Sequence, residues 1–238
     1  MSILLKLNCV DVFKWENKDS IVGVGAVIFF RDTAWLAMII VRADARGSGL
    51  GTEITRFLIQ KARDKKAVNI KLIATEMGEP LYAKLGFEPE GRYLFYRKPG
   101  EFFFNGSTKG VHALNTTDIS SLYALDFKCT GEDRSAFLES FLQDAHGYSE
   151  NGILTGFYLP RAGEGLVVAS TETAALHCMN LRNRDKSVWV FPEQNELAQS
   201  WVSTQHWEPF RQGMRMSLGE KSQWKPEWLY ARISGQVG

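Results

Sequence analysis

Three glycines at alternate positions, preceded by an arginine, form the part of this 238-residue chain best suited to chemistry. The segment runs Arg46-Gly47-Ser48-Gly49-Leu50-Gly51-Thr52, between an apolar run ending at Val41 and a helical pattern. Glycine lets the backbone turn with positive φ and lets a ligand approach without a Cβ in the way. The free N–H groups of a helix's first turn carry the positive end of its dipole, and Arg46 adds a permanent cation. The spacing predicts an anion site.

Two well-known phosphate loops do not fit this segment. A P-loop requires Gly-Lys-Ser/Thr, whereas the chain has Gly49-Leu50-Gly51 without a lysine. A dinucleotide loop requires G-x-G-x-x-G after the first strand of a βαβ unit. Here the spacing is G-x-G-x-G, and the preceding runs have the pattern of an antiparallel meander.

A second informative segment is Leu81-Tyr82-Ala83-Lys84-Leu85-Gly86-Phe87, which follows a predicted strand and lies on a short helical pattern. Together the two segments resemble the GNAT superfamily of N-acetyltransferases. The first is similar to the acetyl-CoA pyrophosphate loop of that family, and the second to its "LYxKLGF" segment. The resemblance implies acetyl-CoA as co-substrate, bound by residues 46–52, and direct transfer of the acetyl group to an amine acceptor.

The resemblance also implies two further parts of the site. Tyr82 would lie near the CoA sulfur and protonate the departing thiolate, which a phenol with a pKa of about 10 can do. The strand before the glycine-rich loop would carry a bulge and diverge from the next strand. Its free amides, at Ile39, Ile40 and Val41, would accept the pantetheine arm and polarise the thioester carbonyl.

A general base for the acceptor amine is not evident. The strand position that often carries Glu in the family falls in the apolar run Leu36-Ala37-Met38-Ile39. Glu76, just after the strand pattern 70–74, is the nearest candidate by topology, and Glu79 is the next; a chain of water molecules is the alternative. Thr75 stands where the family often has Asn, seven residues before the tyrosine.

The first half of the chain has the elements that such a site needs. Strand patterns cover 10–16, 21–30, 34–41, 70–74 and 93–97, and helical patterns cover 52–66 and 79–85. Ile54, Phe57, Leu58 and Ala62 fall on one helical stripe. These patterns predict an α+β fold, with a mixed, mostly antiparallel sheet and flanking helices. The family's usual N-terminal strand and helices, which wall the acceptor site, are expected to be short or absent.

Pro99-Gly100 and the polar stretch 105–110 predict a boundary, giving domains 1–104 and 105–238. The second half has helical patterns at 120–126, 135–145, 172–183 and 196–205, and strand patterns at 152–159, 165–169, 187–191, 213–217 and 228–233. Val202 and His206-Trp207 occupy the places of the tyrosine and the Gly-Phe pair, and Ala169-Ser170-Thr171 has neither arginine nor glycines. This half resembles a degenerate GNAT module in a tandem protein; an unrelated α+β domain is the alternative. One hypothesis is that Trp201, Trp207 and Phe210 cover the first domain or shape its acceptor pocket.

Composition narrows the function classes. The formal net charge is +1 and the pI about 7.7, without the basic excess of a nucleic-acid-binding protein. No apolar run approaches the ~18–20 residues of a membrane span, and no signal peptide is evident. Three scattered cysteines favour a reducing cytoplasm. The four histidines are isolated, so no metal site is predicted.

Two functions from different classes are compatible with these features. The first is an N-acetyltransferase that acts on a small-molecule or peptide amine. The second is a non-catalytic CoA-binding or protein-interaction module, favoured by the missing strand carboxylate. A homodimer is left open as an oligomeric state.

Overall fold

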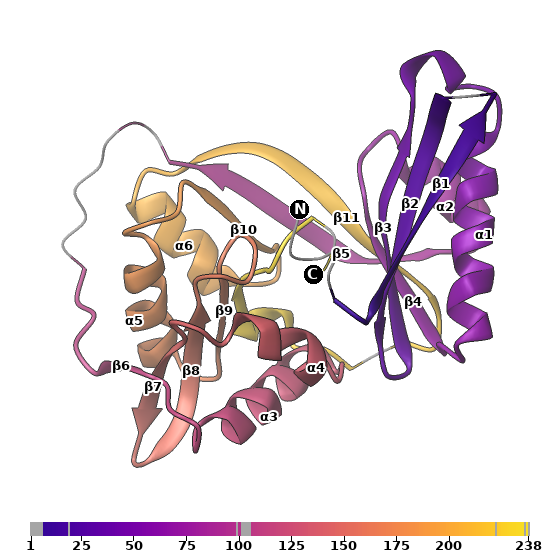
Figure 1. Cartoon of the computed structure of the whole chain (residues 1–238). Coiled ribbons are helices and arrows are strands. Elements are labelled where there is room, and N and C mark those ends of the chain that lie inside the picture. Colours follow the sequence, from indigo (N-terminus) through magenta and orange to yellow (C-terminus); the bar gives the residue numbers. More distant parts are fainter. Residues whose placement is uncertain are drawn as a thin grey trace. The chain divides into compact units, whose positions relative to one another are not determined.

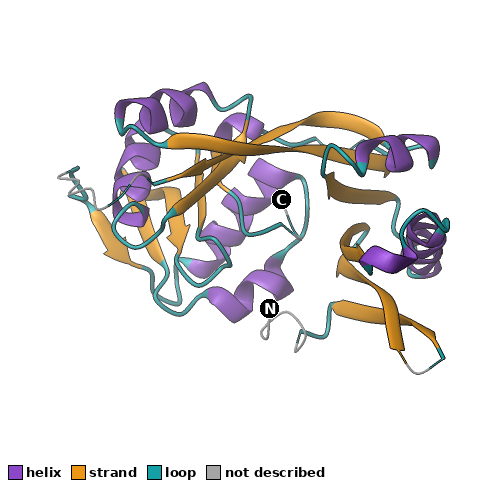
Figure 2. Ribbon diagram, turned by 90° about the horizontal axis from the view of Figure 1, so that it is seen from above, coloured by secondary structure: helices purple, strands orange, loops and turns teal. Residues whose placement is uncertain are grey.

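The computed structural model describes residues 7–18, 20–98, 100, 106–221, 223–235 and 237. The chain forms two compact units, and both are mixtures of helices and strands (Figure 2). Unit 1 comprises Met1–Glu90, Met214–Lys221 and Gly235–Gly238; unit 2 comprises Gly91–Gly213 and Ser222–Ser234. Each unit therefore takes a strand segment from the other half of the chain. The predicted boundary between residues 104 and 105 lies outside the described residues.

Unit 1 is a sheet covered by one long helix (Figure 1). Strands β1 (Val10–Asn17), β2 (Ser20–Phe30) and β3 (Thr33–Val41) form an antiparallel meander, and β4 (Asn69–Ala74) lies parallel to β3. The last part of β11 (Glu208–Gly219) pairs antiparallel with β4. The helices are a 3-10 turn (Ala43–Ala45), α1 (Leu50–Asp64) and α2 (Glu79–Lys84). The predicted α+β class with a mostly antiparallel sheet is confirmed.

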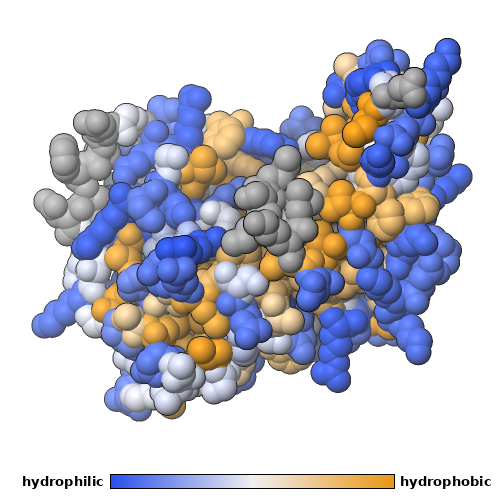
Figure 3. Space-filling model, in the orientation of Figure 1, coloured by the Kyte–Doolittle hydropathy of each residue, from blue (hydrophilic) through white to orange (hydrophobic). Residues whose placement is uncertain are grey.

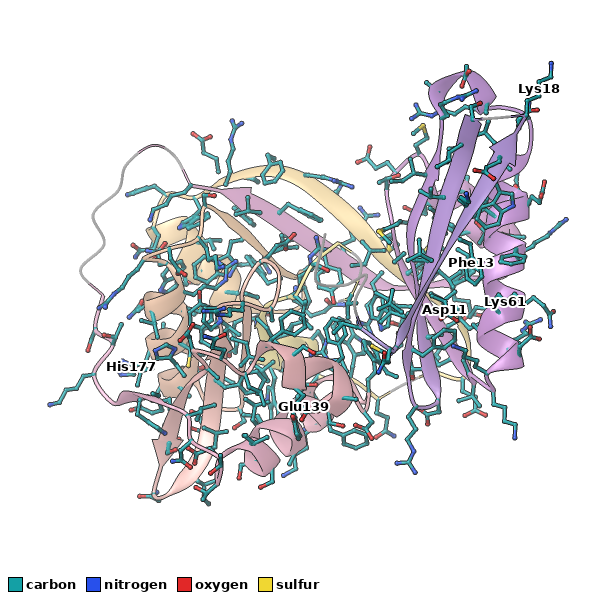
Figure 4. All side chains as sticks on the ribbon, viewed as in Figure 1. Asp11, Phe13, Lys18, Lys61, Glu139 and His177 are labelled. Carbon is teal, nitrogen blue, oxygen red and sulfur yellow. The ribbon has the colours of Figure 1, made fainter. Side chains whose placement is uncertain are left out.

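Helix α1 packs closely on β2 because β2 has glycines beneath it. A Cβ on Gly23 would lie 2.7 Å from Ile54 Cδ1, and a Cβ on Gly25 would lie 2.8 Å from Leu58 Cδ1. Ile54 and Leu58 are fully buried. Phe57, predicted on the same stripe, is instead 37% exposed. Its ring lies edge-on to that of Phe13, with 4.9 Å between centroids. Phe13 is labelled in Figure 4, beside α1.

Unit 2 has more elements than unit 1 and repeats only part of this order. Its strands are most of β5 (Glu88–Arg97), β6 (Val111–Ala113), β7 (His146–Glu150), β8 (Ile153–Leu159), β9 (Leu166–Ala169), β10 (Val188–Pro192), the first half of β11 and β12 (Leu229–Ala231). Its helices are α3 (Ile119–Thr130), α4 (Ser135–Leu138), α5 (Glu172–Arg182), α6 (Glu196–Thr204) and 3-10 turns at Glu139–Phe141 and Pro226–Trp228. One antiparallel sheet has the order β12-β9-β8-β7-β6, and β10 pairs antiparallel with β5. The helix predicted over 135–145 is shorter: α4 ends at Leu138 and continues as the 3-10 turn Glu139–Phe141, and Asp144, at φ +63°, lies outside the right-handed helical region.

The core of unit 2 is built on tryptophans. The ring of Trp189 lies 4.5 Å from that of Trp201 and 5.3 Å from that of Trp207, between centroids. The indole N–H of Trp189 donates to Tyr230 O at 2.7 Å. Trp201 and Trp207 are therefore core residues of unit 2, in a cluster against which Leu94 and Tyr96, from the predicted first domain 1–104, also pack. Phe210 is 47% exposed.

The face of the molecule drawn in Figure 3 mixes hydrophilic residues with apolar areas. No helix within the described parts of the chain is both long and apolar enough to cross a bilayer.

Candidate active site

The glycine-rich loop lies between the end of β3 and the start of α1. Gly47 and Gly49 have φ of +79° and +88°, and Gly49 is the N-cap of α1. A Cβ on either residue would meet no atom within 4 Å, so what these positions require is the left-handed backbone and open space. Gly51 differs, because it lies inside the helix and its Cβ would lie 3.4 Å from Leu81 Cδ1. That short distance also places the start of α1 beside α2, so the two sequence motifs meet.

Several backbone N–H groups of this loop remain available. The amides of Thr52 and Glu53 donate to Gly49 O, at 3.0 and 3.1 Å. The N–H groups of residues 47–51 donate to no acceptor among the residues that the structure describes. They stand at the positive end of the 15-residue helix α1. This arrangement suits an anion. Thr52 differs from the other predicted loop residues, because its amide is already bonded within the loop.

Arg46 and Arg42 have different roles at this loop. Arg42 Nε donates to Asp44 Oδ1 at 2.6 Å, and this bond holds the pKa of the Asp44 carboxyl below its usual value. Arg46 is exposed and its Nε donates to Val41 O at 3.2 Å. Among the described residues no carboxylate forms an ion pair with Arg46, so its charge is open to a ligand. A hollow of about 380 Å³ lies alongside, lined by Asn17, Val22, Arg42, Asp44, Ala45, Ser48, Leu50 and Glu53.

Strand β3 carries the bulge that the resemblance implies. Val24 pairs with Ile40 and Ala26 with Ala37, so β3 has one residue more than β2 between these pairs. Met38 lies there with φ +50°. The extra residue changes which side chains face α1. Ile39 and Val41 pack on the α1 side, whereas Ile40 is 58% exposed.

Strands β3 and β4 also diverge. Their register pairs run only from Thr33↔Asn69 to Trp35↔Lys71, although both strands continue, to Val41 and Ala74. Beyond Trp35, no pairing with β4 is found in the described part of β3. The candidate residues Ile39, Ile40 and Val41 lie on this stretch, which leads directly to the glycine-rich loop. It is unpaired on the side of β4, while on its other side Ile40 and Val41 pair with Val24 and Gly23 of β2.

Tyr82 lies on α2 with its ring partly buried. The ring lies edge-on to that of Phe87, with 6.0 Å between centroids. Its hydroxyl has no hydrogen-bond partner within the described parts of the chain. Burial raises the pKa of the phenol above its ordinary value of 10.0. The hydroxyl therefore stays protonated at neutral pH and is available as a proton donor.

The turn between β4 and Tyr82 holds the candidate bases. Glu76 is exposed, and Glu79 is the half-buried first residue of α2. Thr75 organises the turn: its carbonyl accepts from Gly78 N at 2.8 Å and its Oγ1 from the same amide at 3.2 Å. The Thr that stands in place of Asn thus holds the start of α2.

The corresponding helix N-terminus in unit 2, at the start of α5, is capped by a side chain and flanked by carboxylates, so it is closed to an anion. The hydroxyl of Thr171, the N-cap of α5, accepts from Ala174 N at 3.3 Å and donates to Glu150 Oε1 at 3.2 Å. Glu172 adds a second carboxylate in the first turn. The β8–β9 pairs run from Gly156↔Ala169 to Leu159↔Leu166 without a shift, so β9 has no bulge. Val202, in place of the tyrosine, is fully buried.

Comparisons with known proteins agree with this geometry. Acetyltransferase (GNAT) domain families match residues 10–89 and 122–231. YitH of Bacillus subtilis, described as an uncharacterized N-acetyltransferase, is 32% identical over 136 residues, which are 55% of this chain and 46% of YitH. The chain thus spans about half the length of this relative.

Solved structures extend the likeness to the whole chain. A suspected acetyltransferase from Pyrococcus horikoshii has a TM-score of 0.79 at 26% identity, over 93% of this chain and 78% of that one. A tandem GNAT protein from the clavulanic acid biosynthesis pathway shares the fold, with a TM-score of 0.56 at 12% identity, over 91% and 86% of the two chains. The chain belongs to the GNAT superfamily of acetyltransferases and carries two GNAT domains in tandem.

Proposed function

We propose that unit 1 binds acetyl-CoA and transfers its acetyl group directly to an amine. The observation that carries the proposal is the continuity of two features: the bulged end of β3, which is unpaired on the side of β4, leads straight into a helix N-terminus with available N–H groups. The first suits an extended, amide-containing arm, and the second suits a pyrophosphate. Family membership supports acyl transfer as the reaction.

In this proposal the loop holds the cofactor by its phosphates. The amides of Gly47, Ser48, Gly49, Leu50 and Gly51 donate to the anion. Arg46 neutralises charge, because its guanidinium has no ion-pair partner among the described residues. Thr52 supports the loop through its bond to Gly49 O rather than by direct donation.

The chemical step needs few side chains. Amides of Ile39, Ile40 and Val41 stabilise the negative charge that develops on the thioester oxygen when the amine nitrogen attacks the carbonyl carbon. The carbon–sulfur bond then breaks, and Tyr82 gives its proton to the sulfur. Glu76 remains the first candidate for taking the proton from the amine. Its exposure equally suits a relay through water.

Unit 2 is proposed to hold no acetyl-CoA. The closed start of α5, the carboxylates of Glu150 and Glu172 and the regular β9 all disfavour an anionic ligand with an extended arm. The chain as a whole would bind one CoA. We also propose a cytoplasmic location, which suits three cysteines that form no disulfide among the described residues.

The alternative is a CoA-binding module without catalysis, favoured by the apolar run at 36–39 and the exposure of Glu76. Purified protein is mixed with acetyl-CoA and a panel of amino acids, polyamines and peptides, and free thiol is measured. Thiol release that depends on an amine, and that falls in the Tyr82→Phe variant, supports the enzyme. CoA binding by calorimetry without thiol release across the panel supports the module.

A further inference from the structure

The C-terminal strand β12 lies between two strands of unit 2. It pairs antiparallel with β9, through Leu229↔Val168 and Ala231↔Val167. On its other side, Arg232 N donates to Val190 O of β10 at 2.9 Å. A short segment of the chain is thus bonded to both neighbours.

The place that β12 fills has a counterpart in unit 1. The order β9, α5, β10 repeats the order β3, α1, β4. In unit 1 the two strands pair over three residues and then diverge, with no strand between them in the described residues. In unit 2 the described parts of β9 and β10 form no pair with each other, and β12 lies at that position. The same gap is open in one unit and filled in the other.

The segment around β12 is buried and is held by specific hydrogen bonds. Leu229, Tyr230, Ala231 and Arg232 are each at most 5% exposed. Asn195, itself 1% exposed, donates from Nδ2 to Glu227 O and Leu229 O, both at 3.1 Å. Its Oδ1 accepts from Ala198 N at 2.8 Å, which fixes the amide orientation.

These hydrogen bonds are made to backbone atoms of the segment rather than to its side chains. The carbonyls of Glu227, Leu229 and Tyr230 and the N–H of Arg232 are all bonded to the surrounding unit. Recognition of an extended backbone by a strand edge, with small pockets for alternate side chains, is how proteins bind peptides by strand addition.

We propose that the groove between β9 and β10 is a binding site for an extended peptide, and that its occupant is the chain's own segment 226–234. The second GNAT domain is then a peptide-binding module filled in cis. This inference goes beyond the proposed function, because it needs neither CoA nor catalysis.

The test uses the full chain with a protease site inserted between Glu220 and Lys221, both exposed. The folded protein is cleaved, and a fluorescein-labelled peptide of residues 221–234 is added in urea below the unfolding transition. We expect the labelled peptide to replace the native fragment, followed by anisotropy and size-exclusion chromatography. A peptide with Ala231→Asp, which brings a charge to a fully buried position, should bind at least a hundredfold more weakly. A peptide with Glu227→Gln, at an exposed side chain, should bind as the natural one does.

Three results would overturn the proposal. The labelled peptide fails to enter after a day in urea; it enters equally well with Ala231→Asp; or the native fragment separates while tryptophan fluorescence and the melting temperature stay unchanged. The intact chain with Ala231→Asp gives an independent test. We expect its melting temperature to fall, because the charge expels the strand from the groove, and an unaltered melting temperature would contradict the proposal. A chain that binds no CoA but exchanges the peptide would refute the proposed function and leave this proposal standing.

Discussion

At the scale of single residues, the three loop glycines differ in their backbone conformation. Gly47 and Gly49 have positive φ, whereas Gly51 lies in the first turn of α1. The alternate spacing in the sequence does not show which of the three glycines has a positive φ. Only Gly47 and Gly49 are required by a left-handed backbone, whereas a Cβ on Gly51 would come into contact with Leu81 Cδ1 at 3.4 Å.

We expect Gly49→Val to weaken CoA binding at least tenfold, or about 1.4 kcal/mol, by calorimetry. A β-branched residue is strained at φ +88° and puts a Cβ where the ligand approaches. Gly152→Val is the matched control, because Gly152 has φ +77° and equally open surroundings but lies in unit 2. It should lose similar stability and keep its CoA affinity. Equal CoA affinity in the folded Gly49→Val and Gly152→Val variants would show that the loop is not part of the CoA site.

Tyr82→Phe should lower kcat by roughly 10²-fold and leave CoA binding unchanged, because it removes only the proton donor. Burial raises the pKa of Tyr82, and an acid must be protonated to act. Its activity should therefore persist as the pH rises to about 10 and fall only above that, beyond the ordinary phenol pKa. Tyr123→Phe, on α3, serves as the control. A pH–rate profile that loses activity near neutrality with the tyrosine intact, and keeps that limb in Tyr82→Phe, assigns the loss to another group.

At the scale of elements, unit 2 contains a buried ion pair that joins α3 to the start of α4. Arg134 Nη2 lies 2.5 Å from Asp126 Oδ1, and Nε donates to Asp126 Oδ2 at 2.9 Å. The side chains are 0% and 2% exposed. Removing one partner leaves the other charge buried and uncompensated.

We expect Asp126→Asn to destabilise unit 2 by about 3–5 kcal/mol, measured by urea unfolding. The matched control is Asp144→Asn, which breaks the exposed Arg161–Asp144 pair and keeps a residue that tolerates the positive φ of that position. It should cost less than about 1 kcal/mol. Similar losses in the two variants would show that burial of the Asp126 pair is not what matters.

At the scale of the whole molecule, the two halves of the chain complete each other's units. Residues 214–219 pair with the whole of β4, and Met216, 1% exposed, belongs to the core of unit 1. Arg215 donates to Glu90 Oε2 at 2.5 Å within the same unit. Dividing the chain in the middle therefore takes a strand away from the sheet of unit 1, and it does not separate two independent domains.

Residues 1–104 expressed alone should aggregate or unfold, because the outer edge of β4 would be unpaired and part of the core missing. Co-expression with residues 105–238 should restore soluble protein and one CoA site per pair of fragments. Calorimetry on the full chain should give one CoA per chain. A soluble, fully active 1–104 fragment, or two equivalent CoA sites, would contradict this arrangement.

The sequence by itself determined the chemistry-bearing segments and the order of elements. The glycine-rich loop, the segment around Tyr82 and the strand and helix patterns are local, and local spacing controls turns, dipoles and apolar faces. The tertiary structure alone decided the rest. The bulge at Met38 turned Ile40 outward, residues 214–219 joined β4, and β12 entered between β9 and β10. These are pairings between residues far apart in the chain, and the period of a strand is the same whichever edge it joins.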